Sequence, residues 1–371
     1  MPSGKRMQMG AAGAAGGATS LFTWGTGSSG ANGDGTATAR TSPVLIGEGE
    51  WLAGRDTFAR GSLSGMGIKT DYTLWTWGEG QFGQNGQAGV RKSSPTQLGT
   101  ATNWVKVSIG YKAGSAVNSD GELFTWGRNF SGMLAQNHNI SAISSPVQVA
   151  GTDWATPIMG KSNSLFIKTN GTLWAAGSGY RGAIGDGTST TKSSPIQLGA
   201  RTDWVDATVA SGSCGALTSA GKLYTWGQAN VYGNTGHGNK TDLSIPTQVG
   251  ALTDWAQIAG GWALFVALKV DGTAWSWGRN SYGELGLGDT THRSSPVQIG
   301  ALTDWAQVGA SGHSGWGIKT DGTLWGWGIA INAAWGSGNK NSPVQIGSDT
   351  TWTYVVKMGS RVNNGASAQK T

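Results

Sequence analysis

Residues 305–328 read WAQVGASGHSGWGIKTDGTLWGWG, and this stretch decides the fold. Its residues alternate over 306–310 and again over 315–319, which is the pattern of short β-strands. An Asp-Gly step at 321–322 then leads into 324–327 and is typical of a tight hairpin turn, because glycine tolerates positive φ. Glycine, threonine and β-branched residues fill every candidate segment and no period of 3.6 occurs, so a helical interpretation fails.

The Trp-Gly pair that ends this stretch recurs along the chain. It stands at Trp24-Gly25, Trp77-Gly78, Trp126-Gly127, Trp226-Gly227, Trp277-Gly278 and Trp327-Gly328. The intervals are close to 50 residues apart from one gap of 100, and Ala176-Gly177 fills that gap with Trp174 two residues upstream. We therefore expect seven copies of one unit. A repeat of this length with strand-like content indicates a propeller or a solenoid.

Two further markers keep the same phase. A proline falls in each repeat at Pro43, Pro95, Pro146, Pro195, Pro246, Pro296 and Pro343. A tryptophan follows eight or nine residues later, at Trp51, Trp104, Trp154, Trp204, Trp255, Trp305 and Trp352. Four short strands per repeat, seven times, predict an all-β, seven-bladed β-propeller whose stacked sheets bury the indoles. Glycine beside tryptophan is explained by packing, because a residue without Cβ lets a neighbouring strand come close.

The two ends of the chain predict how the ring closes. Leu21 to Trp24 matches Leu324 to Trp327, and nothing before it supplies the two preceding strands of a repeat. The C-terminal region supplies them: 352–358 matches the first strand of the repeat, and Lys370-Thr371 falls where Lys319-Thr320 falls. We expect one blade to be built from both termini, which removes the free sheet edges of an open array.

Composition favours one folded domain with a short tail. The chain has 371 residues, a formal net charge of +6 and one cysteine, Cys214, which excludes an internal disulfide and fits a small buried side chain. No run of Lys or Arg of the kind that follows a phosphate backbone occurs, so no specific nucleic acid is expected as a partner. No stretch is long and apolar enough to cross a membrane. We assign residues 1–18 to a Gly/Ala-rich tail and 19–371 to the propeller.

One loop carries a resemblance to a known family. The stretch 277–288, WGRNSYGELGLG, resembles the loop signature of the regulator of chromosome condensation repeat, a family of seven-bladed propellers. The resemblance covers roughly residues 21–371, and its style, with Thr-Asp-Gly-Thr-Leu-Trp and Ser-Ser-Pro-Val-Gln, is similar to bacterial and bacteriophage members. Kelch propellers share the period but have a recurring Gly-Gly doublet that is absent here. No long acidic hairpin of the kind used by the family's exchange factor occurs, so binding of a GTPase or nucleosome is not expected.

Motifs for catalysis, cofactors or metals are missing. There is no nucleophile elbow, phosphate loop or HExxH pattern, and the sparse carboxylates show no pairing for acid–base work, so we expect no enzyme activity and no cofactor. His138, His237, His292 and His313 lack ligand spacing and are expected as solvated loop residues. The Gly-Asp-Gly-Thr stretches at 33–36 and 185–188 lack the carboxylate series of a calcium loop, so we interpret them as turns and expect no metal.

Candidate binding residues lie in the loops after Trp-Gly. These loops differ most between repeats while the strands stay alike, as expected when a rigid scaffold displays binding elements. Their large side chains are Phe82, Phe130, Tyr180, Arg181, Tyr232, Tyr282 and Trp335. Each could pack under its own loop, or together they could bind a protein or a glycan, and the sequence leaves these alternatives open.

These observations favour a non-enzymatic structural or adhesive protein of a bacteriophage virion, such as a tail, fibre or decoration component. Its partners would be other virion proteins or a host-surface protein or glycan, in a larger assembly. The alternative is a free-standing bacterial propeller, in the cytoplasm or at the cell surface, that binds a protein or a cell-surface glycan as inhibitor or adhesin.

The N-terminal tail is the expected docking element of that assembly. Its start resembles those of some marine phage virion proteins. Lys5 and Arg6 would pair with acidic groups of a neighbouring subunit, while Met7 and Met9 would fill apolar gaps.

Overall fold

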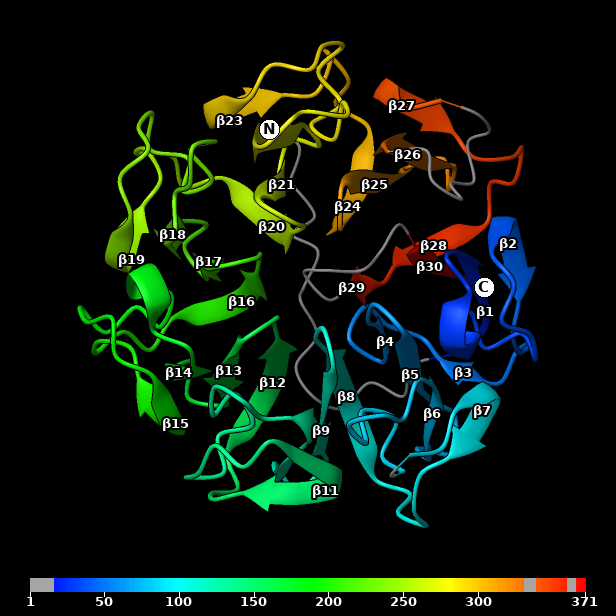
Figure 1. The fold of residues 1–371 in the computed structure, drawn as a ribbon. Coiled ribbons are helices and arrows are strands. Elements are labelled where there is room, and N and C mark those ends of the chain that lie inside the picture. Colours follow the sequence, from blue (N-terminus) through cyan, green and yellow to red (C-terminus); the bar gives the residue numbers. More distant parts are fainter. Residues whose placement is uncertain (1–16, 88, 330–337, 359–364) are drawn as a thin grey trace, which may run out of the picture.

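A computed structural model describes residues 17–87, 89–329, 338–358 and 365–371. Seven sheets, antiparallel apart from one short parallel pairing in blade 2, stand around a common axis, each with the first strand of its repeat near the centre and the last at the rim (Figure 1). The predicted all-β, seven-bladed propeller is confirmed. Trp335 and the proposed docking residues Lys5, Arg6, Met7 and Met9 lie outside the described residues.

Blades 3 to 7 are regular four-stranded sheets in chain order from the axis outward. Their strands are β8 (Trp104–Ile109), β9 (Ala113–Asn118), β10 (Leu123–Arg128) and β11 (Ala142–Val149) in blade 3; β12 (Trp154–Met159), β13 (Asn163–Lys168), β14 (Leu173–Gly177) and β15 (Lys192–Gln197) in blade 4; β16 (Trp204–Val209), β17 (Ser213–Thr218), β18 (Leu223–Gly227) and β19 (Leu243–Gln248) in blade 5; β20 (Trp255–Gly260), β21 (Leu264–Lys269), β22 (Ala274–Gly278) and β23 (Arg293–Gln298) in blade 6; β24 (Trp305–Ser311), β25 (Ser314–Lys319), β26 (Leu324–Gly328) and β27 (Lys340–Gln345) in blade 7. Two single-turn 3₁₀ helices, η1 (Ser28–Gly30) and η2 (Tyr180–Gly182), lie in the loops after the third strands of blades 1 and 4.

Blade 1 contains strands from both termini. Its order from the rim is β2 (Arg40–Leu45), β1 (Ala18–Gly25), β30 (Gly365–Lys370) and β28 (Trp352–Val355). Six consecutive residue pairs, from Ser20 with Lys370 to Gly25 with Gly365, join the N-terminal strand to the C-terminal one. The predicted two-ended blade is therefore confirmed, and the ring closes by a full strand pairing in place of a covalent bond.

Blade 2 departs from the repeat. Its inner strand is split into β3 (Trp51–Leu52) and β4 (Phe58–Arg60), followed by β5 (Ser64–Ile68), β6 (Leu74–Gly78) and β7 (Lys92–Gln97). The break holds four residues more than the same position in blade 3, where the inner strand runs without interruption. β3 pairs with β1, and β29 (Lys357–Met358) pairs in parallel with β4. Two strands thus cross the seam between blades 1 and 2, which strengthens the closure.

The Trp-Gly tryptophans pack between blades, and in blades 2, 3, 6 and 7 the indole N–H also bonds a carbonyl of the preceding blade. The Trp126 indole is buried and its Nε1 donates to the Gln84 carbonyl of the preceding blade at 3.1 Å, and Trp327 bonds Glu284 O in the same way at 3.0 Å. In blade 4 the tryptophan is replaced by Ala176, and Ser164 Oγ donates to the matching Met133 carbonyl instead, at 2.6 Å. A hydroxyl of the adjacent strand thus replaces the indole N–H.

The glycine of the Trp-Gly pair is required by conformation as well as by packing. Gly127 has a φ of 96°, and each of the seven equivalent glycines also has positive φ. A Cβ on Gly127 would lie 2.6 Å from the Lys112 carbonyl oxygen. The packing expected from the sequence is present, and the left-handed backbone adds a second reason that the sequence interpretation did not give.

The connections define two faces of the propeller. On one face lie the loops after Trp-Gly and the turns between first and second strands; we name it the Trp-Gly face. On the other lie the Asp-Gly-type turns and the crossings between blades; we name it the Asp-Gly face. Main-chain hydrogen bonds connect the loops on each face. Examples are Arg279 N to Ala263 O at 2.9 Å on the Trp-Gly face and Trp305 N to Gly272 O at 3.1 Å on the Asp-Gly face.

Candidate functional site

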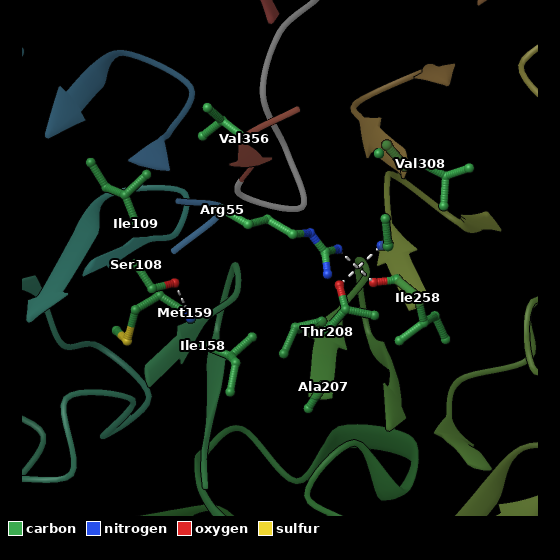
Figure 2. Close-up of a pocket in the computed structure, with 15 residues that line it drawn as sticks. Arg55, Ser108, Ile109, Ile158, Met159, Ala207, Thr208, Ile258, Val308 and Val356 are labelled. Carbon is green, nitrogen blue, oxygen red and sulfur yellow. Dashed lines mark hydrogen bonds between the residues drawn. The ribbon is translucent and has the colours of Figure 1, made fainter. Parts of the chain in front are cut away.

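The axial cavity is lined by residues of all seven blades, and Arg55 is the one charged side chain among the described residues that line it (Figure 2). Its volume is about 30 Å³. A bound water occupies roughly 10–15 Å³ on this measure, so the cavity has room for water but not for a small-molecule substrate. We exclude it as a ligand site.

Arg55 comes from the break in the inner strand of blade 2 and crosses the axis. Its Nη1 lies 3.2 Å from Oδ2 of Asp206 in blade 5, and its Nη2 donates to the Ile258 carbonyl in blade 6 at 3.2 Å. The Gln369 side chain holds the break itself, because its Oε1 accepts from Gly54 N and its Nε2 donates to Leu52 O. Arg55 therefore acts as an internal strut between opposite blades, anchored by the C-terminal strand.

Charge is divided unequally between the two faces. Among the described residues, twelve basic residues lie on the Trp-Gly face, namely Arg40, Arg91, Lys92, Lys112, Arg128, Lys161, Arg181, Lys192, Lys240, Arg279, Arg293 and Lys340. Six acidic residues lie there, and each is within 4.0 Å of a basic one: Asp34, Glu79, Asp186, Asp242, Glu284 and Asp289. The Trp-Gly face thus keeps a surplus of positive charge.

The Asp-Gly face has the opposite balance. Its acidic residues are Glu48, Glu50, Asp71, Asp120, Glu122, Asp153, Asp203, Asp254, Asp271, Asp304, Asp321 and Asp349. Its basic residues are fewer: Lys69, Lys168, Arg201, Lys222, Lys269, Lys319 and Lys370. An acidic partner is therefore attracted to the Trp-Gly face and repelled from the other.

On the Trp-Gly face, one cluster of cations and rings joins blades 2 and 3. We name it the Phe82 patch and define it as Phe82, Gln84, Lys112, Arg128 and Phe130. The two phenyl rings meet edge to face at 5.9 Å. Lys112 Nζ lies 4.5 Å from the Phe82 ring centre and the Arg128 guanidinium 4.4 Å from that of Phe130. Neither cation is paired with an acidic residue in the described part of the chain.

A second cluster of similar composition lies across blades 5, 6 and 7. We name it the Arg279 cluster; its members are Tyr232, Trp262, Arg279, Tyr282, Glu284, His292 and His313. The Arg279 guanidinium lies 4.8 Å from the Trp262 ring centre and 4.9 Å from that of Tyr282. Its Nη1 is 2.7 Å from His313 Nδ1 and 3.7 Å from Glu284 Oε1. Glu284 is fully buried, and burial raises the pKa of its carboxyl.

Tyr180 and Arg181 lie at a shallow hollow between the loops of blades 4 and 5. Its other lining residues include Ser189, Asp242 and Ser244. Arg181 pairs with Asp242 at 3.3 Å, and Tyr180 is 63% exposed. This hollow offers one exposed ring beside hydroxyl and carboxylate groups.

The structure sorts the predicted loop residues into three places. Phe82 and Phe130 contact each other, Tyr232 and Tyr282 both lie against Arg279, and Tyr180 stands beside Arg181. Which of them contact a partner stays a prediction.

The partners of these rings were missed because they lie elsewhere in the sequence. The missed residues are Lys112, Arg128, Trp262, Arg279, Glu284 and His313. Trp262 gave the one available signal, because it falls outside the repeat pattern of tryptophans.

Of the four histidines expected to be solvated, His292 is exposed, whereas His138, His237 and His313 are partly buried. His313 packs against Trp262 at 4.8 Å between ring centres. His237 is half-buried, its Nε2 lies 3.0 Å from Thr225 Oγ1, and burial lowers its pKa. Buried Cys214 is confirmed.

The Gly-Asp-Gly-Thr stretches form turns closed by their own side chains. Asp34 Oδ1 accepts from Thr36 Oγ1 at 2.8 Å, and Asp186 does the same for Thr188. Within the described ranges no three His, Cys, Asp or Glu side chains converge as a metal site would require. No helix among the described residues has the length and apolar character of a membrane span.

Comparisons with known proteins agree with this architecture. A family model described as the RCC1-like domain matches residues 19–365. The ultraviolet-B receptor UVR8 of Arabidopsis thaliana is 28% identical over 276 residues, covering 70% of this chain and 61% of the receptor. The E3 ubiquitin-protein ligase HERC2 of Homo sapiens is 27% identical over 238 residues, covering 60% of this chain and 5% of the ligase. The chain thus spans 61% or less of the length of these relatives.

Solved structures show the same fold. Yeast RCC1 (Prp20), crystallised with Kap60, superposes with a TM-score of 0.81 at 20% identity over 96% of this chain and 89% of that one. Human WBSCR16 also gives 0.81, at 19% identity over 95% of this chain and 99% of that one.

Proposed function

The chain belongs to the RCC1-like domain family, and from that premise we propose that it is a non-enzymatic scaffold whose Trp-Gly face binds a protein partner. One observation carries this proposal: that face combines Lys112 and Arg128, which have no acidic partner among the described residues, with clustered aromatic rings. Arginine and aromatic residues are enriched at protein interfaces. The rigid closed ring beneath these loops fixes their positions before binding and so lowers the entropy lost on association.

The bacteriophage role is the finer part of the proposal. We propose that the propeller is a structural or adhesive component of a virion, in contact with other virion proteins or with a host-surface protein or glycan. The bacterial and phage style of the repeat supports this proposal, as does the start of the tail, where Lys5 and Arg6 precede a Gly/Ala run. The relatives named above are plant and human proteins, so this part rests on the sequence alone.

The alternative proposal is a free-standing bacterial propeller, cytoplasmic or at the cell surface, that binds a protein or a glycan. The Tyr180 hollow favours a glycan here, because an exposed ring can stack on a sugar while Asp242 and Ser189 bond its hydroxyls. Yeast RCC1 (Prp20) binds Kap60, and its structure has been studied together with its binding to Gsp1p and histones. For this chain we propose protein binding as the shared property and not those particular partners.

The test is purification of the full-length protein from the organism that produces it. We expect it in particles at a fixed copy number, and a variant lacking residues 2–17 to keep its circular dichroism and melting temperature while losing incorporation. A truncated protein that assembles at full occupancy would move the docking surface onto the blades and favour the free-standing binder. A full-length protein without any stoichiometric partner would overturn the scaffold function.

A further inference from the structure

Gln84 and Glu284 occupy the same position in two repeats. Gln84 Oε1 accepts the main-chain N–H of Phe82 at 2.8 Å, and Glu284 Oε2 accepts that of Tyr282 at 2.5 Å. In each case the main-chain carbonyl also accepts a hydrogen bond from the indole N–H of a tryptophan in the next blade. Both side chains are buried. The loop geometry is therefore the same with an amide or a carboxylate, and the charge of Glu284 is not needed to build it.

The two side chains differ in what their second polar atom meets. In the Arg279 cluster, Glu284 Oε1 lies 3.7 Å from Arg279 Nη1 and 3.9 Å from His313 Nδ1, so the carboxylate balances the cation. In the Phe82 patch, Gln84 Nε2 is buried and donates to no acceptor among the described residues. By repeat equivalence this N–H faces position 112, where blade 3 carries a lysine in place of the histidine of blade 7.

We propose that the Phe82 patch binds a carboxylate of an acidic protein segment, with a neighbouring apolar side chain of that segment against Phe130. This inference rests on the proposed function and names the partner class of the Trp-Gly face. Three donors of this patch have no acidic or carbonyl partner among the described residues: the buried Gln84 amide, the Lys112 ammonium over Phe82 and the Arg128 guanidinium over Phe130. A buried N–H without a partner costs free energy, and a bound carboxylate oxygen removes that cost.

Neighbouring residues add to the positive potential. Arg91 and Lys92 lie at the start of the outer strand of blade 2, and among the described residues Glu79, 4.0 Å from Arg91, is the one acidic side chain that pairs with them. An acidic segment therefore gains from several cations at once, while few of them are neutralised within the chain.

A protein ligand fits better than a nucleic acid. Phe130 is 48% exposed and its ring packs edge to face on Phe82, which leaves an apolar edge beside the cations. Only two cations flank the rings, whereas binding of a phosphate backbone draws on a longer row of Lys and Arg.

The test uses Gln84→Glu with Glu284→Gln as its matched control. Since the Arg279 cluster already holds a glutamate at this position, Gln84→Glu is expected to fold and to pair internally with Lys112. The probe is a short peptide of alternating Glu and Phe, compared with its Gln-Phe counterpart and with oligo(dT), by fluorescence anisotropy on the full chain. Wild type should prefer the Glu-Phe peptide, and Gln84→Glu should bind it about tenfold more weakly, or about 1.4 kcal/mol. Glu284→Gln removes the carboxylate that faces Arg279, so it should bind the peptide at least as tightly as wild type does.

Other outcomes overturn the site. Equal binding of the two peptides would show that the site does not recognise a carboxylate. Tighter binding of oligo(dT) would show that the ligand is a nucleic acid. An unchanged affinity of Gln84→Glu would show that the peptide binds at another place. If Gln84→Glu does not fold, Lys112→Gln must show the same loss. If the wild-type protein has a native partner but Gln84→Glu does not change peptide binding, the proposed scaffold function holds and the Phe82 patch is not its binding site. A chain with no partner in its native assembly ends the scaffold function itself.

Discussion

The Asp-Gly face and the Trp-Gly face are built from the same seven repeats, yet their charged and aromatic side chains repeat only on the first. On the Asp-Gly face of five blades, a lysine lies over two aromatic rings and pairs with an acidic residue; the lysines are Lys69, Lys168, Lys269, Lys319 and Lys370. We call this arrangement the lysine clamp. On the Trp-Gly face, blades 2 and 6 differ at the matching Gln84 and Glu284, and the clusters differ in net charge.

The difference separates what the fold needs from what recognition uses. An arrangement that recurs in most blades, such as Lys269 beside Trp255 and Trp275, stabilises the strands of its own blade. A device that occurs once, such as the unneutralised Lys112 over Phe82, has no such structural necessity. Repetition along this chain therefore marks stability, and departure from the repeat marks the candidate binding surface.

The largest expected effect comes from removing the clamp that both termini share. Deleting 352–371 removes Lys370 from between Phe22 and Trp352, together with β28, β30 and the Gln369 bonds to blade 2. We expect loss of the cooperative melting transition and aggregation, because the buried indole of Trp24 and an open sheet edge become exposed. Soluble, monomeric protein with an unchanged melting temperature would refute the two-ended closure. Lys370→Met, which retains every strand, is the control.

A smaller effect is expected from a single clamp. Lys269→Met should lower the free energy of unfolding by about 1–2 kcal/mol, because Lys269 is 7% exposed, pairs with Asp254 at 3.3 Å and contacts two indoles. Lys240→Met on the Trp-Gly face, where the lysine is exposed, should leave it within about 0.5 kcal/mol of wild type. Urea denaturation measures both, and equal losses would remove the distinction between the faces.

Opposite pH dependence is expected for one carboxyl of each face. The Lys370 ammonium lowers the pKa of Asp349 from 3.8 to about 2, so the stability this pair contributes is present above pH 3.8 and is lost as the pH falls toward 2. Burial raises the pKa of Glu284 above 4.5, so its contribution is full below pH 4.5 and is lost as the pH rises through the raised value.

Thermal unfolding across pH, with Asp349→Asn and Glu284→Gln, measures these two contributions. Asp349→Asn should lose stability relative to wild type only above pH 3.8, by less than about 1 kcal/mol since the aspartate is exposed to solvent. Glu284→Gln should gain relative to wild type as the pH rises above 4.5. Parallel curves for the two variants would contradict the assignment.

The smallest expected effect is none at all. EDTA should leave the melting temperature and the binding of the Glu-Phe peptide unchanged, because no metal-ligand cluster occurs in the described parts of the chain. A fall in either quantity would show that the turns at Asp34 or Asp186 bind a cation. Added salt, in contrast, should weaken peptide binding, since it screens the surplus charge of the Trp-Gly face.

Much of the fold could be predicted because the repeat is written in the sequence. The spacing of Trp-Gly gives seven units, and the match of 352–358 and 370–371 to the start of a repeat gives the shared blade. These features follow from the period of the sequence, so they can be predicted without knowing which distant residues are in contact.

The candidate site was only half predictable. Phe82, Phe130, Tyr232 and Tyr282 could be named because they are the large residues of variable loops. Their partners come from turns of the same or a neighbouring blade, as Lys112 does for Phe82 and Trp262 does for Arg279. Sequence spacing gives no sign of these pairs, since the hairpins bring them together only when the blades stack.

The sequence by itself determined the seven repeats, the four-strand plan of a regular blade and the closure of the ring, because local alternation and a fixed period set them. Tertiary structure alone decided that Arg55 crosses the axis to Asp206, that β29 joins blade 2, and that basic loops gather on one face while acidic turns gather on the other. The reason is physical: a strand pattern fixes which residues point together within one sheet. The contacts between sheets depend on how seven twisted sheets pack around one axis.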